Sequence, residues 1–152
     1  MDFSNIDPVA ASEAGTFVHL VHPFTRKPLG EGEDKVGFLV RGVAAPSVQS
    51  RLLDLSRQDE EQVDADNKLM LSRLHERWVE GALPYIIRAE GIEMGGRPVS
   101  SEQQYREVLL KSFPDFEVGD DGKLSTRNYP FARQIIDVAE DGSHFFGEIS
   151  PA

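Results

Sequence analysis

The chain has 152 residues, and its 16 Lys and Arg against 26 Asp and Glu give a formal net charge of −10 at pH 7. This length suits one domain with a hydrophobic core of its own. The absence of Cys excludes disulfides and thiolate chemistry. The acidic balance argues against nucleic-acid binding, and no apolar run approaches the roughly 18 residues of a membrane span. We therefore expect a soluble protein that binds neither nucleic acid nor membranes.

The first residues of the chain differ in composition from the rest. Residues 1–14 are mostly small and polar, without an apolar pattern. We predict a flexible N-terminal arm over residues 1–14 and a single α+β domain over residues 15–152.

Two strands are expected at the start of this domain. From Thr16 to Val21, alternation places Val18 and Leu20 on one face, and from Val36 to Val43 it places Phe38 and Val40 on one face. The connection between them is rich in turn-forming residues and contains no helical pattern. The two strands are therefore expected to pair antiparallel.

Helical patterns account for most of the remaining chain. We expect helices from Ala45 to Arg57, from Asp59 to about Gly81, from Ser100 or Ser101 to Phe113, and from an Asn128 cap to Gly142. Tyr85 to Ile92 is rich in β-branched residues and precedes a Gly95-Gly96 turn, which indicates a short third strand. The predicted fold is therefore α+β, with a small antiparallel β-hairpin or three-stranded sheet packed against about four helices.

The motifs of catalytic and metal sites are missing. His19 and His22 are three residues apart in a strand, so they point to opposite faces and are expected to be exposed or hydrogen-bonded. The acidic run from Asp59 to Asp66 lacks the spacing of a calcium-binding loop. Two residues separate Gly119 from Gly122, whereas a phosphate-binding loop has four residues between its glycines. No Ser, His and acid stand in a nucleophile setting. We predict a non-enzymatic protein without catalytic, metal-binding or cofactor-binding residues.

Candidate partner-binding residues are aromatic and aliphatic. Trp78 ends a helical stripe that contains Met70 and Leu74, so it is expected in the core, with a binding role as the alternative. The adjacent Phe145 and Phe146 point in opposite directions in an extended tail, which leaves core packing and partner contact open. Ile149 would extend the same contact.

The order of these segments resembles that of a phage protein family. The shared features are a first strand with a proline-rich turn over residues 16–29 and a second strand leading to Gly42. Further along come residues 86–96, then Arg97-Pro98-Val99 and a helix that begins in Ser100-Ser101-Glu102-Gln103. The chain closes with a helix over 131–138 and the Phe-containing end at 141–146. Over residues 16–146 the chain resembles the small tail assembly chaperones of long-tailed, siphovirus-like phages.

This resemblance implies a function in morphogenesis. Such chaperones bind the tape-measure protein or the tail tube subunit in the cytoplasm of the infected bacterial host, and they perform no catalysis. Self-association into a homo-oligomer is compatible with coating a long partner. Two other functions stay open: a structural virion component, such as a head-tail or tail accessory protein, and an acidic DNA-mimic inhibitor.

Overall fold

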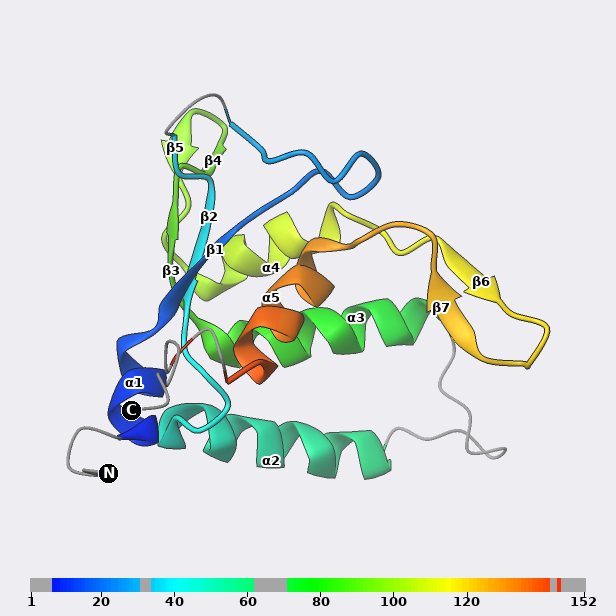
Figure 1. The fold of residues 1–152 in the computed structure, drawn as a ribbon, viewed down its shortest axis with the longest axis horizontal. Helices are drawn as coiled ribbons and strands as arrows, with labels where there is room; N and C mark the ends of the chain where they lie inside the picture. The colour runs from blue at the N-terminus through cyan, green and yellow to red at the C-terminus, as the bar shows by residue number, and fades with distance from the viewer. Residues whose placement is uncertain (1–6, 31–33, 62–70, 143–144, 146–152) are drawn as a thin grey trace, which may run out of the picture.

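An antiparallel sheet of three strands forms one side of the structure (Figure 1). Its strands are β1 (Thr16–His19), β2 (Gly37–Val40) and β3 (Ile86–Glu90), in the order β1-β2-β3. The computed structural model describes residues 7–30, 34–61, 71–142 and 145. Helices pack on one face of the sheet, so the α+β class and the three-stranded sheet are confirmed.

The side chains of the sheet alternate as the sequence predicts. In the pairing of β1 with β2, Val18 lies opposite Phe38 and Thr16 opposite Val40. Val18, Leu20, Phe38 and Val40 are all buried, and the Phe38 ring meets the Tyr105 ring edge-to-face with centroids 5.7 Å apart. This face therefore supplies the sheet's half of the core.

Gly37 allows the close approach of the first two strands. A Cβ atom built at Gly37 would lie 1.9 Å from the backbone oxygen of Val18. Real Cβ atoms do not come this close to a backbone oxygen, so no other residue fits here without separating the strands.

Five α-helices occur in the described part of the chain. They are α1 (Pro8–Ala14), α2 (Pro46–Glu61), α3 (Leu71–Ala82), α4 (Glu102–Leu110) and α5 (Phe131–Glu140), and a single 3₁₀ turn, η2 (Leu83–Tyr85), follows α3. Helix α3 packs against α4 and α5, while α2 packs against η2 and α3. No helix of the described residues is both long enough and apolar enough to cross a membrane.

Two small hairpins complete the fold. The first pairs β4 (Glu93–Met94) with β5 (Arg97–Pro98) around the predicted Gly95-Gly96 turn. The second pairs β6 (Phe116–Val118) with β7 (Leu124–Thr126) and protrudes from the helices in Figure 1. The sequence predicts no strands over residues 116–126, because three-residue strands carry too short an alternation to be recognised.

The prediction of a flexible N-terminal arm is wrong for residues 8–14, which form α1. The Asp7 side chain accepts a hydrogen bond from the Ala10 N–H at 3.0 Å and caps this helix. Ser12 is buried, and its carbonyl accepts the Gly42 N–H. Glu13 pairs with Arg41 at 3.2 Å. Gly42 and Arg41 are distant in sequence, and their contacts hold α1 against the rest of the fold. Residues 1–6 lie outside the described part of the chain.

The boundary expected near Arg57 is also wrong. Helix α2 continues to Glu61, so Asp59, Glu60 and Glu61 form its last turn rather than the first turn of the next helix. Residues 58–61 are good to moderate helix formers, and no Gly or Pro ends the helix among them. Met70 lies outside the described residues.

The predicted N-terminal cap is confirmed for α4 and is wrong for α5. Ser101 and Gln104 form the predicted capping box at the start of α4. Asn128 is not the cap of α5: its buried side chain accepts the Asp115 N–H and donates to the Phe113 carbonyl, each at 2.8 Å. Helix α5 begins after Pro130, and the Phe131 N–H donates to the Ser112 hydroxyl at 2.7 Å.

Candidate functional site

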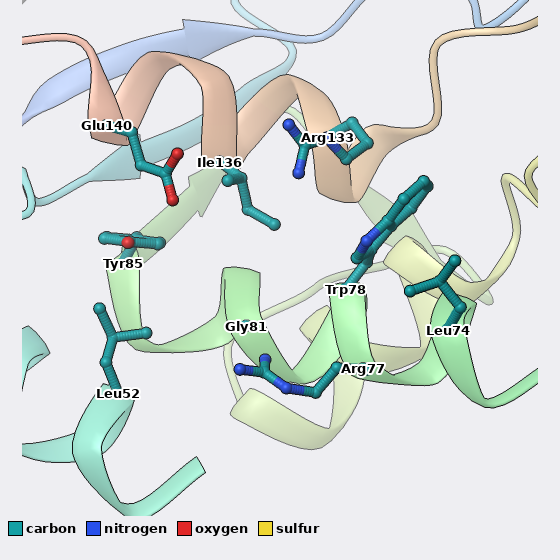
Figure 2. Close-up of a pocket in the computed structure, with 9 residues that line it drawn as sticks. All are labelled: Leu52, Leu74, Arg77, Trp78, Gly81, Tyr85, Arg133, Ile136 and Glu140. Atoms are coloured by element: carbon teal, nitrogen blue, oxygen red, sulfur yellow. The ribbon is translucent and has the colours of Figure 1, made fainter. Parts of the chain in front are cut away.

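A groove lies where α2, α3, η2 and α5 meet (Figure 2), and its volume is about 340 Å³. Helix α3 forms one wall, α5 forms the facing wall, and Leu52 of α2 with Tyr85 of η2 lie at one end. The lining residues are Leu52, Leu74, Arg77, Trp78, Gly81, Tyr85, Arg133, Ile136 and Glu140.

The apolar part of the groove comes from three helices. Leu74 and Trp78 lie on α3, Ile136 projects from α5, and Leu52 comes from α2. Leu52 and Trp78 are half-buried and pack against the main core. The groove is therefore an open extension of the core, with apolar surface that remains accessible to another molecule.

Trp78 is held in place on two sides. Its ring lies 5.6 Å from the Phe116 ring of β6, and the Arg133 guanidinium lies over it at 5.3 Å from the centroid. Arg133 in turn donates to Asp137 at 2.7 Å. An indole fixed in this way loses little side-chain entropy when a partner contacts it, which is a property of good binding anchors.

The charged groups of the groove are unevenly placed. Arg133 lies over Trp78, whereas Glu140 lies beside Tyr85, and the Arg77 guanidinium lies beside Gly81 between these two ends (Figure 2). Burial raises the pKa of Tyr85 to about 12, and the negative charge of Glu140 adds to this effect while Arg77 opposes it. The Tyr85 phenol therefore stays protonated at neutral pH.

Gly81 shapes the wall formed by α3. A Cβ atom there would lie 2.8 Å from Nη1 of Arg77 and 4.0 Å from Cδ1 of Ile136. The missing side chain lets the Arg77 guanidinium lie back along its own helix, as Figure 2 shows. Gly81 thereby sets both the width of the groove and the position of one of its cations.

The other candidate partner-binding residues are not brought to the groove. Phe145 is half-buried and packs against the core close to Gly42, where an added Cβ would lie 3.2 Å from its ring. Phe146 and Ile149 lie outside the described residues. Among the four candidates, Trp78 is the one that the described structure places in the groove.

The two histidines of the pair have separate surroundings, and β1 ends at His19, so strand alternation does not decide the direction of His22. His19 Nε2 lies 3.3 Å from the Leu29 carbonyl, while His22 Nδ1 accepts the N–H groups of Phe24 and Thr25. The two rings are exposed and have separate hydrogen-bond partners. Within the described residues, no cluster of three or more His, Asp or Glu side chains could hold a metal ion.

Sequence reasoning missed most of the groove. Leu52 lies within the helix predicted from Ala45 to Arg57, but Ile136, Tyr85 and Gly81 carry no local signal of a groove. Their convergence depends on how α2, α3 and α5 pack, and periodicity within one helix does not specify this packing.

Comparison with known proteins identifies no relative. No family model, no curated protein and no solved structure matches the chain. The function is therefore inferred from the groove and from the order of elements in the sequence.

Proposed function

We propose that this protein is a non-enzymatic assembly chaperone of long-tailed phages, which binds the tape-measure protein or the tail tube subunit in the cytoplasm of the infected bacterium. The observation that carries the proposal is the groove at α2, α3 and α5, with the half-buried Trp78 in its wall. The order of strands, turns and helices, which resembles that of tail assembly chaperones, supports the choice of partner.

The chemistry of the groove suits one side of a helix. Leu52, Trp78 and Ile136 offer apolar contacts to the aliphatic side chains of an amphipathic helix, the usual occupant of such a groove. Arg133 beside Trp78 and Glu140 beside Tyr85 have opposite charges. A helix with an acidic residue facing Arg133 and a basic residue facing Glu140 would satisfy both ends, which fixes its direction.

The test is co-expression with the tape-measure protein, followed by affinity purification and mass spectrometry. The wild-type chain is expected to retain the tape-measure protein, whereas Leu52→Lys is expected to lose it because a charge enters the apolar groove. Leu53→Lys is the matched control, since Leu53 is exposed on the same helix and does not line the groove.

Gly81→Ala gives a second variant that does not depend on the stability of Leu52→Lys. It changes the wall of the groove without removing a core side chain, so it is expected to weaken capture of the tape-measure protein while the chain stays folded. Capture that is equal in the wild type and in both groove variants contradicts the proposal. Retention of the protein in purified virions in stoichiometric amounts would instead favour a structural virion component.

A further inference from the structure

The long connection between β1 and β2 contains an ordered loop, residues 22–28, called here the aromatic loop. The His22 N–H donates to the Lys27 carbonyl at 2.8 Å, and the Arg26 N–H donates to the His22 carbonyl at 2.9 Å. The His22 ring accepts the N–H groups of Phe24 and Thr25 through Nδ1, each at 3.2 Å. The backbone of the loop is therefore fixed by its own hydrogen bonds.

This fixed loop exposes an aromatic side chain that is followed in sequence by two cations. Phe24 is 65% exposed, although its backbone is held in place. Arg26 has a φ of 60°, a left-handed backbone conformation that non-glycine residues adopt infrequently. The loop contains Arg26 and Lys27 but no acidic residue, in a chain whose net charge is −10. It is a basic, aromatic surface on an acidic protein.

The hairpin of β6 and β7, residues 116–126, has the opposite character and is called here the acidic hairpin. Val118 and Leu124 are direct partners across the two strands, so their side chains share one face. They are 69% and 41% exposed. The turn beside them carries Asp120 and Asp121, and the hairpin as a whole has three acidic residues against one Lys.

The aromatic loop lies beside the base of the acidic hairpin. Tyr129, just after the acidic hairpin, donates its N–H to the Pro23 carbonyl at 2.8 Å, and the Arg26 guanidinium lies 5.2 Å from the centre of its ring. In Figure 1 the aromatic loop and the acidic hairpin both extend from the end of the molecule that lies away from α1. A copy of the chain thus presents both surfaces together.

We propose that these two surfaces form a self-association site, in which the aromatic loop of one copy docks on the acidic hairpin of a second copy. Phe24 packs on Val118 and Leu124, while Lys27 and Arg26 face Asp120 and Asp121. Because both surfaces lie on the same side, a two-fold axis makes each contact twice, as in an isologous dimer. This inference concerns a surface other than the groove and does not depend on the identity of the groove's partner.

Charge decides in favour of this occupant over an acidic polymer or a basic protein. The apolar and acidic hairpin complements the aromatic and basic loop, so a second copy satisfies both surfaces at once, whereas an acidic or a basic partner would satisfy one. Repulsion between two chains of net charge −10 opposes the association. Salt screens that repulsion beyond about 8 Å at physiological ionic strength, so the charges in contact dominate.

Sedimentation velocity on the purified chain over a range of concentrations tests the proposal. The wild type is expected to form a dimer, and Phe24→Ser is expected to weaken it about tenfold or more, since the central aromatic anchor is lost. Leu53→Ser is the control, because Leu53 is also exposed but lies on α2, and it is expected to dimerise like the wild type.

A charge swap separates the specific contact from overall repulsion. Lys27→Glu makes the net charge two units more negative, Asp120→Lys makes it two units less negative, and the two together restore −10. Each single change is expected to weaken the dimer about tenfold, and the double variant is expected to recover it. If overall repulsion governed association, Asp120→Lys would strengthen it.

Several results would overturn this assignment. One is a wild type that stays monomeric up to about 1 mM, the limit of a weak specific contact. Tighter association of Asp120→Lys, or no recovery in the double variant, would do the same. Binding of poly-L-glutamate by a monomeric wild type, lost in Lys27→Glu, would assign the aromatic loop to an acidic partner protein instead.

Discussion

The side chain of Gln134 pairs with the backbone of Val21 through two hydrogen bonds. Its Oε1 accepts the Val21 N–H at 2.9 Å, and its Nε2 donates to the Val21 carbonyl at 3.0 Å. Nε2 also donates to the Tyr129 carbonyl at 2.8 Å. The buried amide thus acts as a strand partner just beyond the end of β1 and joins it to α5.

Replacing this amide is expected to be costly. Gln134→Leu leaves the Val21 N–H and two carbonyls without their partner in a buried site, so the free energy of unfolding should fall by about 2–3 kcal/mol. Urea denaturation measures the change. Gln49→Leu is the control, since this exposed side chain makes one hydrogen bond, to the Val43 carbonyl. A similar small loss in both variants would show that the pairing with Val21 contributes little.

The capping box of α4 gives a second prediction. The Ser101 hydroxyl accepts the Gln104 N–H at 3.3 Å, and the Gln104 side chain accepts the Ser101 N–H at 3.2 Å. Ser101→Ala should lower the free energy of unfolding by about 1 kcal/mol. Ser100→Ala should change it by less than about 0.5 kcal/mol, because Ser100 contributes its backbone N–H alone to this cap. The same urea titrations check both, and equal losses would contradict the cap assignment.

Gly81 allows stability and binding to be separated. Gly81→Ala should raise the free energy of unfolding by about 0.5–1 kcal/mol, because Ala is favoured over Gly within a helix and the guanidinium of Arg77 can move aside. Gly42→Ala should have the opposite effect, since its Cβ would lie 2.7 Å from the Ser12 hydroxyl oxygen and 3.2 Å from the Phe145 ring. A lower melting temperature for Gly81→Ala would show that the groove is packed more tightly than its geometry indicates.

His75 gives the protein a specific sensitivity to acid. Its ring is buried against Phe113, with centroids 4.9 Å apart, and Nε2 has no hydrogen-bond partner among the described residues. Burial lowers the pKa of His75 from its ordinary value of 6.5, while a hydrogen bond to the Leu109 backbone and the charge of Glu76 oppose the shift. The unfolded chain therefore binds the proton first as the pH falls.

The sign of the effect follows from this order. The contribution of neutral His75 is fully present above pH 6.5 and is lost as the pH falls below that value. Urea unfolding at about pH 7.5 and about pH 5.5 should show a fall in stability that is smaller in His75→Leu than in the wild type. His19→Gln, at an exposed site, should keep the fall of the wild type. An unchanged pH dependence in His75→Leu would assign the acid sensitivity to other groups.

Local patterns predicted the parts of the fold whose partners are close in sequence. The alternation of Val18 and Leu20 identified the buried face of β1, and the spacing of Ser101 and Gln104 identified the start of α4. Each signal depends on residues within one element, where backbone geometry determines which side chains meet.

The errors arose where a distant segment decides the structure. Asn128 has the composition of a helix cap, but its side chain is used by Phe113 and Asp115, and Ser112 meets the first N–H of α5 instead. Residues 8–14 looked mobile because Ser12 shows its role only beside Gly42. The groove also depends on segments that are distant in sequence: the apolar stripe of its helix identified Trp78, but nothing identified Ile136.

The acidic hairpin begins and ends at nearly the same point in space. The Arg127 N–H donates to the Asp115 carbonyl at 2.9 Å, and the Asn128 side chain accepts the Asp115 N–H. A peptide tag or a reporter domain inserted after Asp121 would therefore extend from a closed base and leave the rest of the chain in register. A fluorophore attached at the same position would report on the proposed docking of a second copy.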